Sequence, residues 1–331
     1  MQTVNILFGS VGRRVELVRA FRHAYEALGL EGSLVATEID TLAPALQLVD
    51  KGYLVPRLDD PAYIPELIEI CKAEQIHLLF PLIDPEVPVL ARARAELEAA
   101  GVRPAVLTDQ HVAAVSDKWL TFELFDSIGV PTPRSWLPDR LPDEIEFPVF
   151  IKPRSGSAAK DTFRVDDARR LEFFLDYIEE PIVQEFLDGP EITSDVVCDM
   201  DGELLGVVSR KRLEVRSGEV AKGVTVRDPE IERHCVTIAK ALDVVGPITA
   251  QCIVHGGHPY FTEVNPRFAG GSPLAIAAGA DFPTWILARA AGVPLDIPPL
   301  GTYTKGLFVT RFDDCFILDE RERSRAASRR V

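Results

Sequence analysis

The first hundred residues alternate between short apolar runs and longer amphipathic stretches. Val4–Phe8 and His77–Pro81 are apolar runs of strand length, whereas Arg13–Leu28 and Tyr63–Glu74 carry apolar residues at the spacing of one helix face. Strands that are apolar throughout are typical of a parallel sheet covered by helices on both faces. We therefore predict an α/β domain with a parallel sheet over residues 1–107.

The pattern changes in the second part of the chain, where strand-length segments are separated by short turns. The dipeptides Asp201-Gly202 and Gly256-Gly257 interrupt such segments, and both are favoured in tight hairpins. We predict an α+β domain with mainly antiparallel sheets over residues 108–318. Within this domain we predict a small lobe at about 118–190 and a large lobe at about 191–318. Residues 319–331 after it are predicted to form a charged and frayed tail.

Charge narrows the range of partners. The chain of 331 residues has 36 basic and 51 acidic residues, a formal net charge of −15 at pH 7. A surface this acidic repels nucleic-acid phosphates and anionic lipids, so neither nucleic acid nor membrane is a predicted partner. No basic leader or long apolar segment precedes the first strand, and the five cysteines are scattered without a C-x-x-C pair. We therefore expect a cytoplasmic protein with free thiols.

The most informative segment is Phe261–Arg267, which contains the pattern Glu-x-Asn-x-Arg. Alternate residues of a strand point to one face, so Glu263, Asn265 and Arg267 would present a carboxylate, an amide oxygen and a guanidinium in one row. Mg²⁺ prefers oxygen ligands and takes few of them from protein, and an arginine suits a phosphate. A lone pattern of this kind is more often a solvated strand face, but two further segments favour a metal site.

The first of these segments is the preceding strand. Ile248–Val254 leads through His255–His258 into the strand of Glu263, which predicts a hairpin. A two-residue Gly-Gly loop places Thr262 opposite Gln251, whereas a three-residue loop or a bulge places Gln251 level with Glu263. In the second arrangement Gln251 adds an oxygen donor to the row.

The second segment is an apolar strand that delivers Lys152 and continues into the small-residue loop Arg154–Lys160. Backbone N–H groups of such a loop can close over phosphates, although the loop lacks the P-loop spacing and small polar loops are common. Ile182–Glu191 is a strand edge followed by an acidic residue, which suits an adenine and a ribose but equally an exposed turn. Arg210-Lys211-Arg212 is either a phosphate clamp or a basic surface strand.

These segments, in this order, resemble the ATP-grasp superfamily, and within it the proteins similar to the large subunit of carbamoyl-phosphate synthase. Val4–Arg14 is similar to the start of the domain that precedes the ATP-grasp fold, and Asp117-Lys118 with Gly129–Pro133 is similar to the family's lysine-bearing helix and its exit. The resemblance covers nearly the whole chain. It implies an N-terminal parallel α/β (pre-ATP-grasp) domain followed by a two-lobed ATP-grasp fold with antiparallel sheets.

The resemblance also implies how the chain would hold ATP between two sheets. Two lysines would contact the phosphates or the adenine side, and a serine of the closing loop would cover the phosphates. A strand edge would border the adenine, and an acidic residue would bind the ribose. In that order, the residues are Lys118 and Lys152; Ser157; Gln184, Glu185 and Leu187; and Glu191.

The remaining implied sites bind metal and stabilise the transferred group. The metal is Mg²⁺, with Mn²⁺ as a possible substitute, and the basic strand would meet the γ-phosphate. The implied residues are Gln251, Glu263 and Asn265 for the metal, Lys211 (or Arg210 or Arg212 beside it) for the γ-phosphate, and Arg267 for the transferred phosphate or the carboxylate.

The implied reaction is a ligation. ATP phosphorylates a carboxylate to an acyl phosphate and an amine or a thiol then displaces phosphate, which requires no side-chain nucleophile. The alternatives are a phosphotransferase that stops at the phosphorylated product and a catalytically silent ATP-binding regulatory subunit. The expected partners are small-molecule carboxylates and amines, with a homodimer as one possible assembly. The identity of the substrate is expected to depend on the edge of the N-terminal sheet and on Arg267–Ser272.

Two features depart from the family. The loop Ser155–Lys160 has fewer glycines than the family's usual form, which puts its closure over ATP in question. The chain also has a single ATP-grasp unit and no glutamine-hydrolysing domain, so synthesis of carbamoyl phosphate is not expected.

Overall fold

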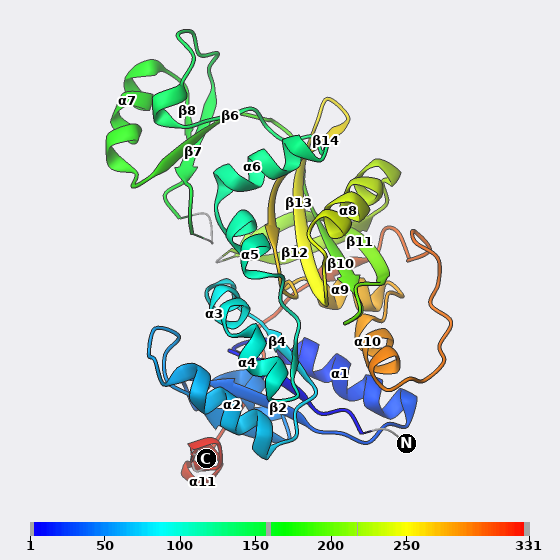
Figure 1. Cartoon of the computed structure of the whole chain (residues 1–331). Helices are drawn as coiled ribbons and strands as arrows, with labels where there is room; N and C mark the ends of the chain where they lie inside the picture. The colour runs from blue at the N-terminus through cyan, green and yellow to red at the C-terminus, as the bar shows by residue number, and fades with distance from the viewer. Residues whose placement is uncertain (1–2, 157–159, 217, 328–331) are drawn as a thin grey trace.

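The computed structural model describes residues 3–156, 160–216 and 218–327, of which 324–327 are described without their side chains. Within these residues the chain folds around three sheets (Figure 1). In this view the N-terminal sheet and its helices lie at the bottom, the six-stranded sheet lies in the middle and the four-stranded sheet lies at the upper left. None of the helices described has the length and apolar character needed to cross a membrane.

The N-terminal sheet is parallel throughout, with the strand order β3-β2-β1-β4-β5. Leu7 packs into one buried cluster while its neighbours Ile6 and Phe8 pack into another, because helices cover both faces of the sheet. The chain runs outward from β1 on one side and from β4 on the other. The carboxyl ends of β1 and β4 therefore form a topological switch point, where open α/β sheets bind ligands.

The elements of this domain follow the predicted alternation. Helix α1 ends where Gly29 adopts a left-handed conformation (φ 59°). The elements are β1 (Ile6–Gly9), α1 (Val15–Leu28), β2 (Leu34–Glu38), the 3₁₀ helix η1 (Pro44–Leu48), β3 (Lys51–Leu54), α2 (Tyr63–Ala73), β4 (Leu78–Pro81), the 3₁₀ helix η2 (Asp84–Glu86), α3 (Val87–Arg92), α4 (Arg94–Ala99) and β5 (Arg103–Pro104).

The four-stranded sheet forms the core of a small lobe, reached through two helices. Its strands are antiparallel in the order β6-β9-β7-β8, and Leu171 of α7 packs with Val149, Ile151 and Val183 of the sheet. The elements are α5 (Asp109–Ser116), α6 (Lys118–Ser127), β6 (Ser135–Trp136), the 3₁₀ helix η3 (Pro138–Arg140), β7 (Val149–Pro153), β8 (Phe163–Val165), α7 (Ala168–Tyr177) and β9 (Pro181–Glu185).

The six-stranded sheet is antiparallel, with the order β14-β13-β10-β11-β12-β15. One face is apolar: Ile192, Cys252 and Phe261 pack in one buried cluster with Cys235 and Ile238 of α8. The opposite face carries polar side chains. The elements are β10 (Glu191–Cys198), β11 (Leu204–Arg216), β12 (Glu219–Val226), α8 (Pro229–Ala241), β13 (Pro247–His255), β14 (His258–Asn265), α9 (Ser272–Ala277), α10 (Phe282–Ala290) and β15 (Phe308–Thr310).

The predicted fold class is confirmed, since a parallel α/β domain is followed by two lobes with antiparallel sheets. The charged tail differs from the prediction, because part of it forms helix α11 (Glu320–Ala327) beside β3. Asp319 accepts hydrogen bonds from the N–H groups of Arg321 and Glu322, and Glu322 accepts one from the N–H of Asp319. This capping box starts a helix that charge composition alone does not predict.

Candidate active site

The β13–β14 hairpin decides which side chains share a face. Its loop is Gly256-Gly257, with φ angles of 59° and 89° that glycine adopts readily. A bulge at Thr262 then adds one residue to β14, so that Gln251 pairs with Glu263. The short loop and the bulge therefore occur together, and the oxygen donor of Gln251 lies level with Glu263.

Two rows of polar side chains cross this face of the six-stranded sheet. Asn265 Nδ2 donates a hydrogen bond of 3.0 Å to Glu263 Oε1, which joins the rows at β14. Paired residues on neighbouring strands share a face. The first row is Arg210, Thr193, Gln251 and Glu263, and the second is Asp195, Thr249 and Asn265.

The predicted metal ligands are thus brought together on one face. Gln251, Glu263 and Asn265 are each partly buried, and they offer one carboxylate and two amide groups. This donor set suits a hard cation that keeps water or phosphate oxygens as its other ligands, so the residues fit Mg²⁺ or Mn²⁺.

Two lysines lie within electrostatic reach of Glu263. Lys152 on β7 is 7% exposed, and burial lowers its pKa to about 8, while Glu263 raises it and Lys118 lowers it. Burial also lowers the pKa of Lys118, the first residue of α6, and Glu263 opposes this shift. Buried ammonium groups of this kind are stabilised by a bound anion such as a phosphate.

The loop after β7 is fixed at its start. Asp117 caps α6 by accepting hydrogen bonds from two N–H groups, and it forms an ion pair with Arg154 at 2.5 Å. Lys118 Nζ donates to the carbonyl oxygen of Gly156 at 3.0 Å. Ser157, which is predicted to cover the phosphates, lies outside the described residues together with 158 and 159.

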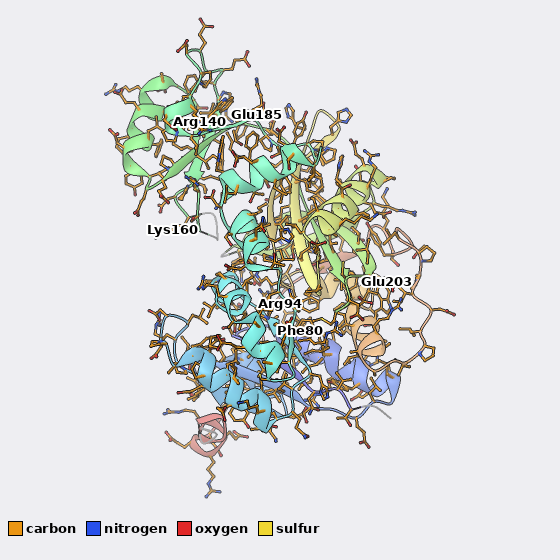
Figure 2. All side chains as sticks on the ribbon, viewed as in Figure 1. Phe80, Arg94, Arg140, Lys160, Glu185 and Glu203 are labelled. Carbon is orange, nitrogen blue, oxygen red and sulfur yellow. The ribbon has the colours of Figure 1, made fainter. Side chains whose placement is uncertain are left out.

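The residues predicted at the adenine lie on β9 and just after it. Gln184 is buried and donates from Nε2 to Ser135 Oγ at 2.7 Å. Glu185, labelled on the small lobe in Figure 2, forms an ion pair with Arg134 at 2.8 Å. Leu187 is partly buried.

The basic strand β11 presents its residues to alternate faces. Lys211 pairs with Ile192, in the row that continues into the apolar core. Arg210 and Arg212 therefore lie on the polar face, and both line the cavity there. Arg212 forms an ion pair with Glu191 at 2.5 Å. The structure thus places Arg210 and Arg212, and not Lys211, on the predicted site face.

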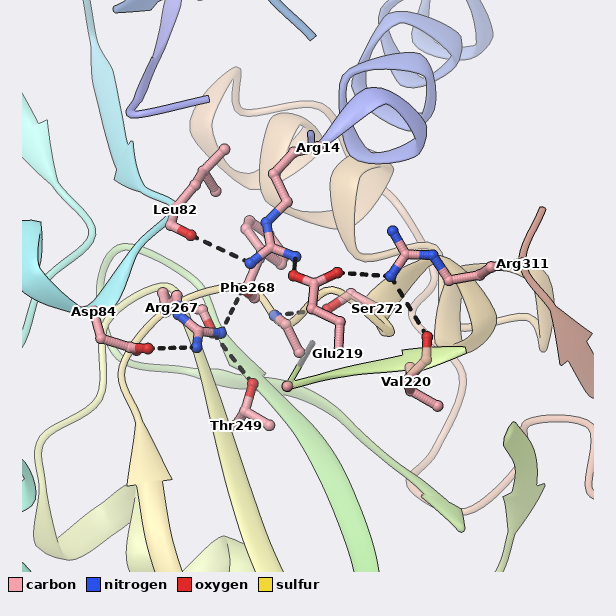
Figure 3. Close-up of polar contacts among 12 residues, drawn as sticks. Arg14, Leu82, Asp84, Glu219, Val220, Thr249, Arg267, Phe268, Ser272 and Arg311 are labelled. Atoms are coloured by element: carbon pink, nitrogen blue, oxygen red, sulfur yellow. Dashed lines mark hydrogen bonds and ion pairs between the residues drawn. The ribbon is translucent and has the colours of Figure 1, made fainter. Parts of the chain in front are cut away.

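The rows of polar residues end in a cavity next to Arg267. Arg267 forms an ion pair with Asp84 at 2.7 Å and donates to the carbonyl oxygen of Phe268 at 3.1 Å (Figure 3). The cavity is lined by Arg14, Thr193, Arg210, Arg212, Gly218, Glu219, Val220, Thr249, Gln251, Asn265, Arg267, Ala269, Gly270 and Gly271.

Sequence reasoning missed the residues that the N-terminal domain contributes. Arg14 lines the cavity and Asp84 pairs with Arg267, although neither is among the predicted site residues. A signal was present, because these residues follow β1 and β4, whose carboxyl ends form the switch point of the sheet. No local pattern indicates Glu219, whose partner Arg14 is distant in sequence.

Two family models match the chain. The PylC-like N-terminal domain matches residues 6–105, and the ATP-grasp domain matches residues 115–271. The carbamoyl-phosphate synthase of Methanobrevibacter smithii is 29% identical over 171 residues, which are 49% of this chain and 45% of that protein. The chain thus spans less than half the length of this curated relative.

Solved structures share the fold. The L-amino acid ligase from Bacillus licheniformis has a TM-score of 0.67 and 20% identity, over 88% of this chain and 75% of its own. The biotin carboxylase domain of 2-oxoglutarate carboxylase from Hydrogenobacter thermophilus, solved with MgADP, ADP and bicarbonate, has a TM-score of 0.71 and 17% identity. The structural match covers 93% of this chain and 74% of the biotin carboxylase chain.

Proposed function

Since this chain belongs to the ATP-grasp superfamily of ligases, we propose that it uses ATP to activate a carboxylate as an acyl phosphate for attack by an amine or a thiol. The family membership confirms the resemblance drawn from the ordered motifs. The observation that carries the proposal is the placement of Gln251, Glu263 and Asn265 on one face of the sheet, within electrostatic reach of the buried Lys152.

Gln251, Glu263 and Asn265 would hold Mg²⁺, or Mn²⁺ in its place. The bound metal supplies positive charge that neutralises phosphate oxygens during transfer. Glu263 also raises the pKa of Lys118 and of Lys152, which opposes the lowering that burial causes. Support for this assignment comes from the shared face and from the oxygen donors, which suit a hard cation.

The remaining site residues would bind and orient the nucleotide. Lys118 and Lys152 would bind its phosphates, and Gln184, Glu185 and Leu187 would border the adenine, with Glu191 at the ribose. Arg212, which lies on the polar face, would take the γ-phosphate contact that the resemblance implies for Lys211. The loop that contains Ser157 would shield the acyl phosphate from water.

In the proposed reaction a carboxylate oxygen attacks the γ-phosphorus, and ADP leaves. The nucleophile then attacks the acyl carbon, inorganic phosphate leaves, and the nucleophile loses a proton to solvent. Arg267, held by Asp84 at 2.7 Å, would orient the carboxylate or the transferred phosphate. The alternatives predict other patterns of ADP release: a phosphotransferase releases ADP without the amine, and a regulatory subunit binds ATP without releasing ADP.

We also propose a cytoplasmic protein whose partners are small-molecule carboxylates and amines. The net charge of −15 supports this proposal, because it disfavours nucleic acid and anionic membranes. The homodimer stays a prediction, for which the molar mass in solution by light scattering is the direct test.

The central test replaces the metal-binding carboxylate. Glu263→Ala is expected to lower Mg²⁺-dependent ADP release by at least about 100-fold, in line with the loss of a preorganised electrostatic contact. Far-ultraviolet circular dichroism should stay unchanged, because Glu263 is on a partly exposed face. The control is Glu16→Ala, an exposed residue of α1 paired only with Arg19 in the described structure. Wild-type turnover in Glu263→Ala would remove the proposal.

A further inference from the structure

A second group of charges lies beside Arg267, at the meeting point of three parts of the chain. Arg14 follows β1, Glu219 begins β12 and Arg311 follows β15. Glu219 Oε1 accepts from Arg14 Nη1 at 2.8 Å, and Oε2 accepts from Arg311 Nη1 at 2.6 Å (Figure 3). One carboxylate is therefore held between two guanidinium groups.

The charges of this group do not balance. Three other arginines of the site each have a carboxylate of their own: Arg210 with Asp195, Arg212 with Glu191, and Arg267 with Asp84. In the part of the chain that the structure describes, Arg14 and Arg311 share Glu219 as their carboxylate. One positive charge therefore exceeds the negative charge at this point.

The excess charge is partly buried. The side chain of Arg14 is 13% exposed, and burial lowers its pKa. The charge of Glu219 raises this pKa, whereas the charges of Arg267 and Arg311 lower it further. Desolvated charge of this kind is costly unless an anion compensates it. A second carboxylate at this point would restore the balance.

The position fits a substrate site. Arg14 Nη2 donates to the carbonyl oxygen of Leu82 at 3.3 Å, so the side chain bridges the ends of β1 and β4 at the switch point of the sheet. The same cavity continues from Arg14 to Gln251 and Asn265 of the proposed metal site. A molecule bound at Arg14 would thus lie in the space that leads to the reacting groups.

Further features of the lining indicate a binding site. A Cβ atom on Gly270 would lie 2.5 Å from Glu219 Oε2 and 2.6 Å from Arg14 Nη1, so the ion pair in this position occupies space that the glycine leaves. Among the residues described, Thr193 Oγ1 and the Nε atoms of Arg210 and Arg267 are buried without a hydrogen-bond partner. Buried polar atoms normally have partners, and a polar ligand would supply them.

We propose that Arg14 and Arg311 form a subsite for a substrate carboxylate that the reaction does not consume, and that Glu219 occupies this subsite until the substrate binds. The inference rests on the proposed function, in which Arg267 and the proposed metal site receive the reacting groups. The non-reacting carboxylate belongs either to a dicarboxylate acceptor or to an amino acid nucleophile. The chemistry recognised at Arg14 and Arg311 is the same for both.

The first experiment measures binding and needs no turnover. Isothermal titration with succinate, and with acetate as the single-charge probe, is compared for the wild-type protein, Glu219→Gln, Arg311→Gln and the exposed control Arg57→Gln. Glu219→Gln removes the internal competitor, so its affinity for succinate is expected to rise about tenfold, equivalent to about 1.4 kcal/mol. Arg311→Gln should lower that affinity about tenfold, and Arg57→Gln should not change it.

A purely structural role for Glu219 gives the opposite result. Loss of a stabilising ion pair would lower the thermal midpoint of Glu219→Gln and leave succinate affinity at or below the wild-type value. That outcome, or an unchanged affinity of Glu219→Gln for both succinate and acetate, would overturn the subsite.

The second experiment measures ADP release with ATP and Mg²⁺ for two kinds of substrate pair. One kind combines a dicarboxylate with an uncharged amine, and the other combines a monocarboxylate with an amino acid. A monocarboxylate with an uncharged amine is the reference pair, which has no non-reacting carboxylate. The active pair should contain the non-reacting carboxylate, and Arg311→Gln should raise the KM for that substrate while the KM for ATP stays the same. Best turnover with pairs that lack such a carboxylate would refute the subsite. ADP release with no pair, while the succinate results hold, would refute the ligase proposal and leave the subsite standing.

Discussion

Glu86 shows at the scale of one residue how the N-terminal domain keeps a buried acid next to the switch point. Its side chain is fully buried, and Tyr63 donates a hydrogen bond to it at 2.5 Å. A Cβ atom on Gly9 would lie 2.0 Å from Glu86 Oε1, so the carboxyl group occupies the space that this glycine leaves. Burial raises the pKa of Glu86 to about 7, although hydrogen bonds from Tyr63, Ser10 and Leu82 lower it.

The stability of the protein should depend on pH through Glu86. Its pKa in the folded protein lies above the ordinary value of 4.5, so the folded state binds more protons than the unfolded state between about 4.5 and about 7. The contribution of Glu86 is therefore fully present below pH 4.5 and is lost as pH rises through 7, by up to about 3 kcal/mol.

Glu86→Gln removes this titration. The free energy of unfolding of the variant, relative to wild type, should rise between pH 5 and pH 8, as measured by urea unfolding at each pH. Glu26→Gln, on the exposed face of α1, serves as the control and should follow the wild-type profile. Parallel profiles for Glu86→Gln and wild type would contradict the burial argument.

Residue placement could be predicted where a strand has one polar and one apolar face. Glu263 and Asn265 share the face that their alternation predicts. The face of Lys211 could not be predicted in this way, because the consecutive residues Val207 and Val208 just before it are both buried. The sequence pattern of β11 therefore does not show which alternate residues point to the polar face. The contact of Arg14 with Glu219 joins residues too distant in sequence for any local pattern to show.

At the scale of an element, the start of α6 links helix stability to the proposed nucleotide site. Asp117 Oδ1 accepts from the N–H groups of Trp119 at 2.8 Å and Leu120 at 3.3 Å, and its carboxylate also pairs with Arg154. The same residue thus caps the helix that begins with Lys118 and fixes the strand end that leads into the loop proposed to cover the phosphates.

Two substitutions separate these roles. Asp117→Asn keeps a capping oxygen and loses the ion pair, whereas Asp117→Ala loses both and should cost about 1 kcal/mol of stability through the cap. Both should raise the KM for ATP, because Arg154 and Lys118 lose their fixed positions. Asp167→Ala is the matched control, since Asp167 caps α7 in the same lobe and should cost similar stability with an unchanged KM. A wild-type KM in Asp117→Asn would show that the ion pair does not position the loop.

The β13–β14 hairpin shows how far elements could be predicted. The Gly256-Gly257 loop follows from local turn chemistry, but the bulge at Thr262 depends on the core. Phe261 and Val264 are both buried, and they are three residues apart, which a regular strand cannot place on one face. This odd spacing is the sequence signal for the bulge that aligns Glu263.

At the scale of the whole molecule, the N-terminal domain and the six-stranded lobe share a core. Phe268 is 1% exposed, and its ring centroid lies 5.9 Å from that of Phe21 and 5.7 Å from that of Phe80, which Figure 2 labels in the N-terminal domain. Phe268 directly follows Arg267, so packing between the domains also sets the position of the site. The fold class could be predicted from periodicity, but this contact could not, because its members are distant in sequence. The division of the chain at residue 107 stays a prediction.

A shared core predicts that the two domains unfold together. Wild-type protein should show one calorimetric transition, whereas Phe268→Ala should lose about 3–5 kcal/mol of stability and show two separate transitions. Phe125→Ala is the matched control, because Phe125 is fully buried beside Phe261 and belongs to α6, which packs on α5, β6 and β14. It should lose similar stability but keep one transition. In Phe268→Ala the displacement of Arg267 should also raise the KM of the acceptor more than the KM of ATP. A single transition in Phe268→Ala, with calorimetric and van't Hoff enthalpies in agreement, would mean that other contacts couple the domains.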